Sequence, residues 1–406
     1  MHFQYCNPAR AMLQYFLMFY IEEGWPVRYR TLGKTGLSVS EIGLGCEHLQ
    51  WKDEKLIREV IDAALDGGVN ILDIFMSERQ VRTDIGKALK GRRDKVIIQG
   101  HLGSCWLDGQ HRRSNDLPLS IENFEDFLTR LGTDYVDLAM LHHVDTDENY
   151  EAMVHGGVLD YGLKLKQKGM IGHIGMSSHN PAVACRAVEE GVVDMLMFSI
   201  NPAFDLLDDH AKETGALVPG SEGDGDRHAE RKKLYETCES KGVGITVMKA
   251  FGSGMLLDAR TSPLGKAMTA NQLIRYALSR PAVASVLVGM QRASDVEAAL
   301  AYENATDAEC DYAEILSGAL TGSAKGRCMY CNHCLPCPSM LDIAAINKFY
   351  DLAQLNEGNM DSLRDHYLSL QHHAGECIGC GSCETLCPFD VAIRDRMTKI
   401  NQLFGK

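Results

Sequence analysis

Eight short apolar runs recur between residues 41 and 290, and this repeat limits the fold more than any other feature. They cover residues 41–45, 70–75, 95–100, 136–142, 173–178, 195–200, 244–250 and 285–290. Each run is continuously apolar, as in a parallel strand that is covered on both faces. Stretches with helical periodicity lie between them, at 55–65, 81–89, 121–131, 181–190, 231–241 and 271–279.

Eight such units over about 270 residues fit an α/β fold of the (β/α)8 TIM barrel type. A doubly wound open sheet is the alternative. That fold usually carries a Gly-rich dinucleotide turn after its first strand, and no such turn is present here. The sequence therefore favours the barrel.

Fourteen cysteines are present, and eight of them lie between Cys328 and Cys387. In a chain of 406 residues this density indicates metal binding and not a disulfide framework. The first run has the spacing C-x2-C-x2-C-x2-C-P, and the second has C-x2-C-x2-C-x3-C-P. Their cysteines are Cys328, Cys331, Cys334 and Cys337, then Cys377, Cys380, Cys383 and Cys387.

These runs predict two [4Fe-4S] clusters, because three thiolates at this spacing converge on one cubane and the fourth reaches the other cluster. One cluster is then held by Cys328, Cys331, Cys334 and Cys387. The other is held by Cys377, Cys380, Cys383 and Cys337. A pair of zinc knuckles is the alternative, but zinc sites rarely use a triple C-x2-C-x2-C run. Helical patterns at 341–352 and 360–371 favour an α-helical ferredoxin-like domain.

The composition narrows the choice of partner and compartment. A formal net charge of −14 argues against nucleic acid, which needs clustered Lys and Arg. Residues 11–21 are apolar but too short to span a membrane. Cysteine-bound clusters indicate a reducing cytoplasm, and that of an anaerobe.

The chain divides into four parts on the same grounds. Residues 1–26 form an extension that we expect to lie outside the fold, with an amphipathic strap on the barrel as the alternative. The barrel covers 27–302, a linker 303–327 and the cluster domain 328–406. The acidic, Gly-rich stretch 205–226 is either a lid over the barrel rim or a disordered insertion.

Several blocks of the barrel resemble the aldo-keto reductases. They are YRTLGKTGLSVSEIGLG at 29–45, the blocks within 70–99, DYVDLAMLH at 134–142, IGHIGMSSHN at 171–180 and GVGITVMKAFGSGML at 242–256. The resemblance spans residues 29 to about 302, and the cysteine tail matches a branch of that family with a ferredoxin-like domain. It implies a carbonyl reductase that uses NADPH.

The resemblance also implies a catalytic tetrad of Asp, Tyr, Lys and His, in which the Tyr is a general acid tuned by its neighbours. Asp73 matches the Asp and His142 matches the His. Glu78 stands at the position of the Tyr, and His101 at that of the Lys. Two of four positions are kept, and the proton donor is changed.

The positions that the family uses for the nicotinamide cofactor have changed as well. The Ser-Asn pair is Ser177–Ser178 here, and the Gln of the sixth strand is Met197. Gly289 and Arg292 remain available for a phosphate. Each lost buried hydrogen-bond partner costs on the order of 1–3 kcal/mol. NADP(H) is therefore a doubtful cofactor, and the clusters offer another electron source.

The leading hypothesis is an iron–sulfur oxidoreductase of the aldo-keto reductase type. It acts on a small carbonyl or alcohol substrate and takes electrons from a ferredoxin or another donor. Glu78, His101 and His142 transfer protons, and Asp73 orients His101. The first alternative is a non-redox lyase or isomerase that uses Glu78, His101 and His142. The second is an electron-transfer protein with a non-catalytic barrel. Polar side chains at the barrel mouth also suit a metal ion: Cys46, His48, His143 and His179.

Overall fold

The computed structural model describes residues 27–206, 227–319, 326, 328, 334–355, 360–387 and 390–406. The expected N-terminal extension, residues 1–26, lies outside these residues, and so does Cys331. Within the described helices, none is long and apolar enough to cross a membrane.

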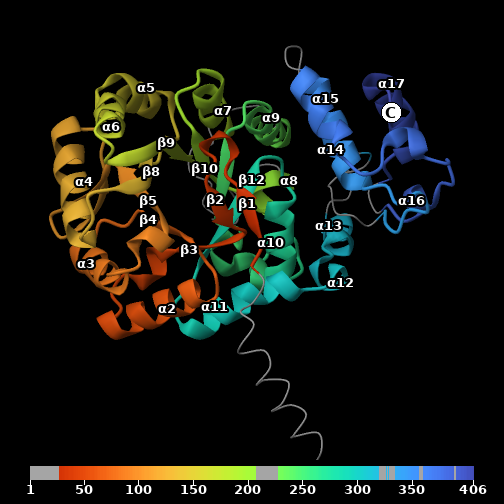
Figure 1. The fold of residues 1–406 in the computed structure, drawn as a ribbon. Coiled ribbons are helices and arrows are strands. Elements are labelled where there is room, and N and C mark those ends of the chain that lie inside the picture. Colours follow the sequence, from red (N-terminus) through yellow and green to blue (C-terminus); the bar gives the residue numbers. More distant parts are fainter. Residues whose placement is uncertain are drawn as a thin grey trace, which may run out of the picture.

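Eight parallel strands close into a barrel (Figure 1). In order around it they are β3 (Ile42–Gly45), β4 (Ile71–Ile74), β5 (Ile97–Leu102), β8 (Val136–Leu141), β9 (Ile171–Ser178), β10 (Met195–Ser199), β11 (Gly244–Met248) and β12 (Val283–Gly289). The register closes where Val286 of β12 pairs with Ile42 of β3. Each predicted run overlaps one strand. The barrel prediction is therefore confirmed, and the open sheet is excluded.

Helices surround the barrel (Figure 1). Their amino ends are set by short polar caps, such as Asp53, whose carboxylate accepts the N–H of Leu56, and Asp116, whose carboxylate accepts that of Leu119. The helices are α2 (Glu54–Asp66), α3 (Arg79–Ala88), α4 (Leu117–Leu131), α5 (Asp147–His155), α6 (Val158–Gln167), α7 (Pro181–Glu189), α8 (Pro202–Leu206), α9 (Arg227–Ser240), α10 (Ala270–Leu278) and α11 (Ala293–Leu300).

A hairpin closes the amino-terminal end of the barrel. It consists of β1 (Tyr29–Thr31) and β2 (Ser38–Ser40). Leu32 and Val39 are fully buried and pack with side chains of the barrel interior. Gly33 lies so close to the start of β11 that an added Cβ would be 2.3 Å from the carbonyl oxygen of Gly242. This end is therefore sealed, and the carboxyl end is left for ligands.

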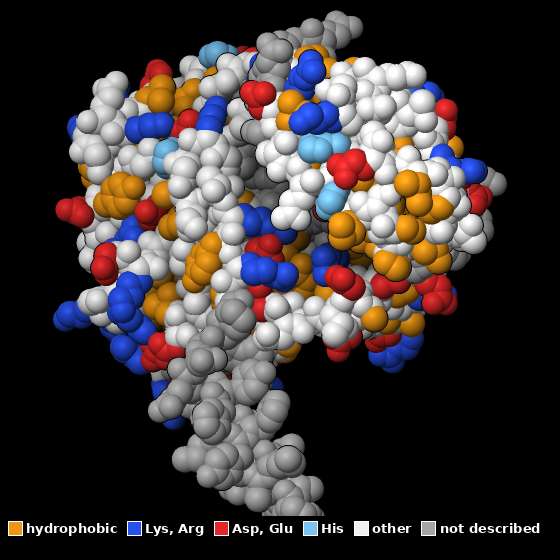
Figure 2. Space-filling model, turned by 45° about the vertical axis from the view of Figure 1, so that its right-hand side comes forward, with side chains coloured by type: hydrophobic (Ala, Val, Ile, Leu, Met, Phe, Trp, Pro, Cys, Tyr) orange, Lys and Arg blue, Asp and Glu red, His pale blue; other side chains and the backbone are white. Residues whose placement is uncertain are grey.

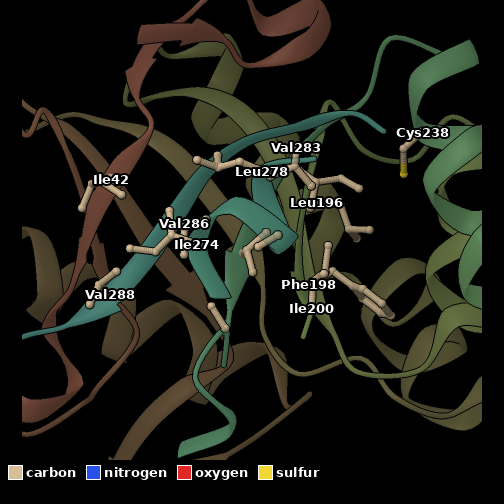
Figure 3. Close-up of a cluster of buried hydrophobic side chains, with 14 of the residues drawn as sticks. Ile42, Leu196, Phe198, Ile200, Cys238, Ile274, Leu278, Val283, Val286 and Val288 are labelled. Carbon is tan, nitrogen blue, oxygen red and sulfur yellow. The ribbon is translucent and has the colours of Figure 1, made fainter. Parts of the chain in front are cut away.

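The main apolar core lies between the strands and the surrounding helices. Figure 3 shows part of it, where Leu196 and Phe198 of β10 and Val286 of β12 meet Ile274 of α10 and Cys238 of α9. All five side chains are fully buried. Burial of this kind contributes roughly 25 cal/mol per Å² of apolar surface, so the strands are held as a rigid support for the residues at their carboxyl ends.

The C-terminal domain lies beside the barrel, next to α9 (Figure 1). Its helices are α14 (Ile343–Leu355), α15 (Met360–Leu368), α16 (Ser382–Thr385) and α17 (Ile393–Phe404), so the prediction of a helical domain is confirmed. Helix α14 packs on α9. The Nζ atom of Lys348 lies 3.2 Å from Oε1 of Glu239, and the Nζ atom of Lys232 lies 3.6 Å from Oδ1 of Asp351.

The expected linker at 303–327 differs from the structure. Its first part folds into α12 (Asp307–Cys310) and α13 (Ala313–Ala319). The side chains of Tyr312 and Leu316 are buried in the main core. The polar composition that suggested a linker belongs to residues 321–327, of which only Gly326 is described.

Only the first two residues of the expected lid or insertion at 205–226 are described, and they belong to α8. Asp205 lies in α8 and is buried. Its carboxylate accepts hydrogen bonds from Arg231, Tyr235 and Tyr276. A buried carboxylate with three donors is a structural group. Residues 207–226 lie outside the described part of the chain.

Candidate active site

A cavity of about 660 Å³ opens at the carboxyl ends of the barrel strands. Side chains from five strand ends line it, which is the arrangement that places catalytic groups in barrels. They include Asp73, His101, His142, Ser177 and Met248.

A chain of hydrogen bonds leads from a buried carboxylate to this cavity. The Nε2 atom of His101 lies 2.8 Å from Oδ1 of Asp73. The Nδ1 atom of His101 lies 3.0 Å from Nδ1 of His142. All three side chains are buried, yet each borders the cavity. The Nε2 atom of His142, at the end of the chain, has no hydrogen-bond partner among the described residues.

The chain fixes which nitrogen carries a proton. When His101 is neutral, its Nε2–H donates to Asp73, so its Nδ1 must accept from Nδ1–H of His142. The Nε2 atom of His142 is then a bare base. When His101 is protonated, it donates at both nitrogens, and His142 carries its proton on Nε2 as an acid. The state of His101 thus sets the role of His142.

The position of Asp73 is set by a second pair of buried polar groups. The hydroxyl of Thr246 donates to Oε1 of Gln99 over 2.9 Å. This contact turns the amide Nε2 of Gln99 toward Asp73, where it donates to Oδ1 over 3.0 Å. Asp73 therefore accepts two hydrogen bonds on the same oxygen, and these fix its orientation.

Burial keeps His142 itself uncharged. The pKa of His142 lies well below its ordinary value. Burial is the main cause, and the neighbouring His101 and His111 lower it further. The ring of Phe75 stacks on that of His142 with centroids 5.8 Å apart. A neutral imidazole that can carry its proton on either nitrogen suits acid and base work at neutral pH.

A third histidine of the cavity comes from a hairpin after β5. Its strands are β6 (Ser104–Leu107) and β7 (Gln110–Arg113). The hydroxyl of Ser77 donates to the carbonyl of Cys105, so Nδ1 of His111, 2.9 Å away, is the donor to Ser77. Burial and the nearby Arg113 lower the pKa of His111 to about 4. The turn Asp108–Gly109, both with positive φ, is the sequence signal that could have revealed this hairpin.

Two basic side chains border the same cavity. They are Arg113 of the hairpin and Lys249, which directly follows β11. Neither has a carboxylate within ion-pair distance among the residues that the structure describes. Burial lowers the pKa of Lys249. The backbone of Lys249 has φ +58°, a conformation that costs energy in a non-glycine residue and is common at functional sites.

Four of the predicted cluster cysteines lie close together in the described structure. Cys337 of the first run lies with Cys377, Cys380 and Cys383 around a single pocket of the C-terminal domain. This is the crossed set that the spacing predicts. Contacts from the backbone N–H and the hydroxyl of Ser382 lower the pKa of the exposed Cys380, and a thiolate is the form that binds iron.

The other set is only partly described. Cys334 is buried, and Cys328 and Cys387 are partly buried and pack against the main core. Cys331 and the proline after Cys387 lie outside the described residues. The donor type and the partial burial of these cysteines fit a cluster.

Family models match both parts of the chain. The model "Aldo/keto reductase family" matches residues 41–317, and the model "4Fe-4S dicluster domain" matches residues 325–391.

The chain belongs to the aldo/keto reductase family.

Relatives and solved structures agree with this assignment. The chain is 31% identical to "Uncharacterized oxidoreductase YqkF" of Bacillus subtilis over 66% of this chain and 88% of that protein. It is 23% identical to an L-glyceraldehyde 3-phosphate reductase of Escherichia coli over 57% of this chain and 63% of that one. An aldo-keto reductase of Bacillus halodurans, AKR11C1 in its holo form, has a similar fold, with a TM-score of 0.55 and 24% identity over 72% of this chain and 96% of that chain. The protein is therefore an oxidoreductase of the aldo/keto reductase family with an iron–sulfur domain.

At the position of the family's Tyr, this aldo/keto reductase differs from the sequence prediction. Glu78 does not line the cavity. Its two carboxylate oxygens accept the backbone N–H groups of Gln80 (2.8 Å) and Val81 (2.6 Å) and so cap helix α3. A carboxylate at a helix N-terminus is stabilised there by the backbone dipoles. Glu78 is thus held away from the His101–His142 pair.

The two serines predicted to contact the nicotinamide form hydrogen bonds with other residues of the chain. The hydroxyl of Ser177 accepts the N–H of His143 over 2.8 Å, and the hydroxyl of Ser178 donates to Oδ1 of Asp145 over 3.2 Å. Ser178 is fully buried and does not line the cavity. Met197 lines the cavity with a thioether, which is a poor substitute for an amide.

Side chains of the protein itself occupy the position where the resemblance places the cofactor phosphate. A Cβ on Gly289 would lie 2.3 Å from the ring of His48, so that ring covers the glycine. At the start of α11, Oδ2 of Asp295 accepts the N–H groups of Gln291 (2.9 Å) and Arg292 (3.1 Å). A phosphate at this helix end would meet a like charge. The residues present do not fit the family's mode of NADP(H) binding.

Proposed function

We propose that this oxidoreductase interconverts a small carbonyl compound and its alcohol, with protons handled by His101 and His142. The hydrogen-bonded chain from Asp73 to His142 carries this proposal, because His142 lines the cavity and its Nε2 has no hydrogen-bond partner among the described residues. It does the work that the resemblance assigns to Tyr and Lys.

The two rings supply one of the two protons of the reduction, the one that goes to the substrate oxygen. With His101 protonated, the pair holds three ring protons: two on His101 and one on Nε2 of His142. When the Nε2 proton passes to the substrate oxygen, the Nδ1 proton of His101 moves 3.0 Å to Nδ1 of His142. His101 is left neutral and still donates to Asp73. In alcohol oxidation the same transfers run backward, and Nε2 of His142 is the base.

We propose that electrons come from two [4Fe-4S] clusters and not from NADP(H). The ligands are Cys328, Cys331, Cys334 and Cys387 for one cluster and Cys377, Cys380, Cys383 and Cys337 for the other. When bound, each cluster would supply one electron at a time. A carbonyl takes up two electrons and two protons to become an alcohol: the His101–His142 pair delivers the proton that goes to oxygen, and water in the open cavity delivers the proton that goes to carbon. The crossed position of Cys337 and the like charge of Asp295 at the phosphate position support this part of the proposal.

The domain surface supports an external electron donor of the ferredoxin type. Hydrophobic side chains are visible on the face of the C-terminal domain (Figure 2). Met340 is 71% exposed, and Ile378, two residues before the exposed Cys380, is 70% exposed. Exposed apolar side chains next to a cluster ligand give a donor a short path and a contact surface.

Two cations of the cavity wall, which also carries Glu47, Asp73 and Asp295, favour one substrate class. Arg113 and Lys249 face it without an ion-pair partner among the described residues, so a substrate with a carboxylate or phosphate group would neutralise them. The E. coli relative carries the name of a reductase of a phosphorylated aldehyde. We propose a small anionic aldehyde, ketone or hydroxy acid.

The test uses the full chain, purified without oxygen and with its iron and sulfide measured. The clusters are reduced with dithionite, excess reductant is removed, and anionic carbonyl compounds are added one by one. A compound that reoxidises the clusters and yields its alcohol supports the proposal. Reoxidation at equal rates in wild type and His142→Gln would refute the assigned role of His142, and His155→Gln, an exposed histidine of α5, is the matched control.

A further inference from the structure

Three side chains on another wall of the cavity form a compact group that the proposed proton transfer does not use. They are His143 and Asp145, which lie between β8 and α5, and His179, which follows β9. Each offers one possible ligand atom, and these atoms all lie within 4.8 Å of one another. His143 and His179 also line the cavity.

The distances in this group match those around a metal ion. The Nε2 atom of His143 lies 3.3 Å from Oδ2 of Asp145, and Nδ1 of His179 lies 3.0 Å from the same oxygen. Two ligand atoms that are about 2.1 Å from a tetrahedral ion lie about 3.4 Å apart. Small shifts of the side chains would therefore bring three donors around one ion.

Contacts outside the group hold Asp145 in place. Its Oδ1 atom accepts the hydroxyl of Ser178 and, over 2.6 Å, the backbone N–H of His179. The side-chain amide of Asn180 donates to the backbone carbonyl of Asp145 over 2.9 Å. One oxygen of the carboxylate is thus occupied, and Oδ2 faces the two histidines. Such supporting hydrogen bonds are typical of residues that bind metals.

His143 is held just as firmly. Its φ of +55° is unfavourable for a residue with a Cβ, and its N–H donates to the hydroxyl of Ser177. Strained backbone of this kind clusters at binding sites.

Nε2 of His143 is buried, and its contact with Oδ2 of Asp145 does not form a hydrogen bond. Nε2 of His179 is also buried and lacks a hydrogen-bond partner among the described residues, while Nδ1 of the same ring lies against Asp145. The His179 residue is only 8% exposed. A buried polar atom without a partner costs free energy, so it calls for an explanation such as an ion.

We propose that His143, Asp145 and His179 bind one divalent transition-metal ion at the cavity wall. Two imidazoles and one carboxylate suit Zn²⁺ and Fe²⁺. Three protein ligands leave at least one position for water or for an oxygen of the substrate, on the side where His143 and His179 border the cavity. An ion there would polarise a carbonyl oxygen. This site is separate from the cysteine clusters and does not depend on the source of electrons.

The test is calorimetric titration of the anaerobic holoprotein, with its full complement of iron, with ZnCl2. We expect one zinc per chain with no loss of iron, and an affinity at least 100-fold lower in Asp145→Asn and His179→Gln. His155→Gln should bind zinc as the wild type does. Iron content and unfolding temperature in the absence of zinc show that each variant is folded.

Two results would overturn the site. One is no zinc uptake by the iron-loaded wild type, which would leave the three side chains as a hydrogen-bonded cluster. The other is wild-type affinity in Asp145→Asn and His143→Gln together, which would place the zinc elsewhere. Neither readout requires a substrate, so failure here is distinct from failure of the proposed reaction.

Discussion

The Nδ1 atom of His142 lies 3.0 Å from Nδ1 of His101, and only one proton can occupy that contact. The two rings therefore share one proton between them, with Asp73 at one end and the cavity at the other. In this member of the aldo/keto reductase family, the pair stands where the resemblance expects a lysine and a histidine.

His142→Gln should abolish most of the activity, because Gln cannot pass a proton from one side to the other. General acid catalysis contributes about 10²–10⁴-fold, so a fall of that size is expected in the rate at which an accepted carbonyl compound reoxidises the reduced protein. Iron content and unfolding temperature should stay near the wild-type values. A rate within threefold of wild type would remove His142 from the mechanism.

Glu78→Ala should reduce stability and leave turnover nearly unchanged. The variant loses the cap of α3, which is worth about 0.5–2 kcal/mol, and roughly 2–4 °C of Tm per kcal/mol is expected for a unit of this size. Glu78→Asp, which keeps a capping carboxylate, is the control for stability. A large loss of activity at unchanged Tm would restore the catalytic role that the sequence suggested.

Serine substitutions should sort the cysteines into two groups. Cys337→Ser and Cys380→Ser should lose the same cluster, although the two residues belong to different runs, because both border one pocket. Iron should fall from about eight to about four atoms per chain. Cys334→Ser and Cys387→Ser should remove the other cluster, which electron paramagnetic resonance of the reduced protein can distinguish. Loss of different clusters in Cys337→Ser and Cys380→Ser would contradict the crossed assignment.

Glu236 should make stability fall as pH rises. It lies on α9, where the C-terminal helix α14 packs, and burial raises its pKa from 4.5 to about 8. The folded chain therefore holds a proton that the unfolded chain releases above about pH 4.5. The contribution of protonated Glu236 to the stability of the folded chain is fully present below about pH 4.5. It is lost as the pH rises through 8.

Glu236→Gln removes this titration. Its Tm should exceed that of wild type by a few degrees at pH 8.5, and the gap should narrow toward pH 5. Glu230→Gln, on the same helix, is the control for a change of one charge. An equal offset in Tm at every pH would show that Glu236 does not titrate in this range.

The sequence was sufficient for the barrel because its strands are buried on both faces, so each appears as an uninterrupted apolar run. The grouping of Cys337 with the second run stays a prediction, and its position beside Cys377, Cys380 and Cys383 supports it. The sequence did not predict the position of Glu78. A match to a family position says nothing about the local backbone, and Glu is an unusual N-cap residue, so the sequence gives little sign that Glu78 caps a helix.

Contacts between distant residues could not be predicted from spacing. His101 and His142 are 41 residues apart, and their hydrogen bond depends on the register between β5 and β8, in which His101 lies opposite Met140. His111 reaches the cavity only because β6 and β7 fold back over the rim, with Trp106 opposite His111. Asp145 was missed because it follows the strand by four residues, in a loop without periodicity.

The source of electrons is the central claim, and binding of NADPH tests it most directly. Oxidised holoprotein with its full iron content is titrated with NADPH without oxygen, while ligand fluorescence and cluster absorbance are both followed. The account predicts a Kd weaker than about 1 mM and no bleaching of the clusters, because Asp295 occupies the phosphate position and the Ser177 and Ser178 hydroxyls are already bonded. Micromolar binding of NADPH would contradict it.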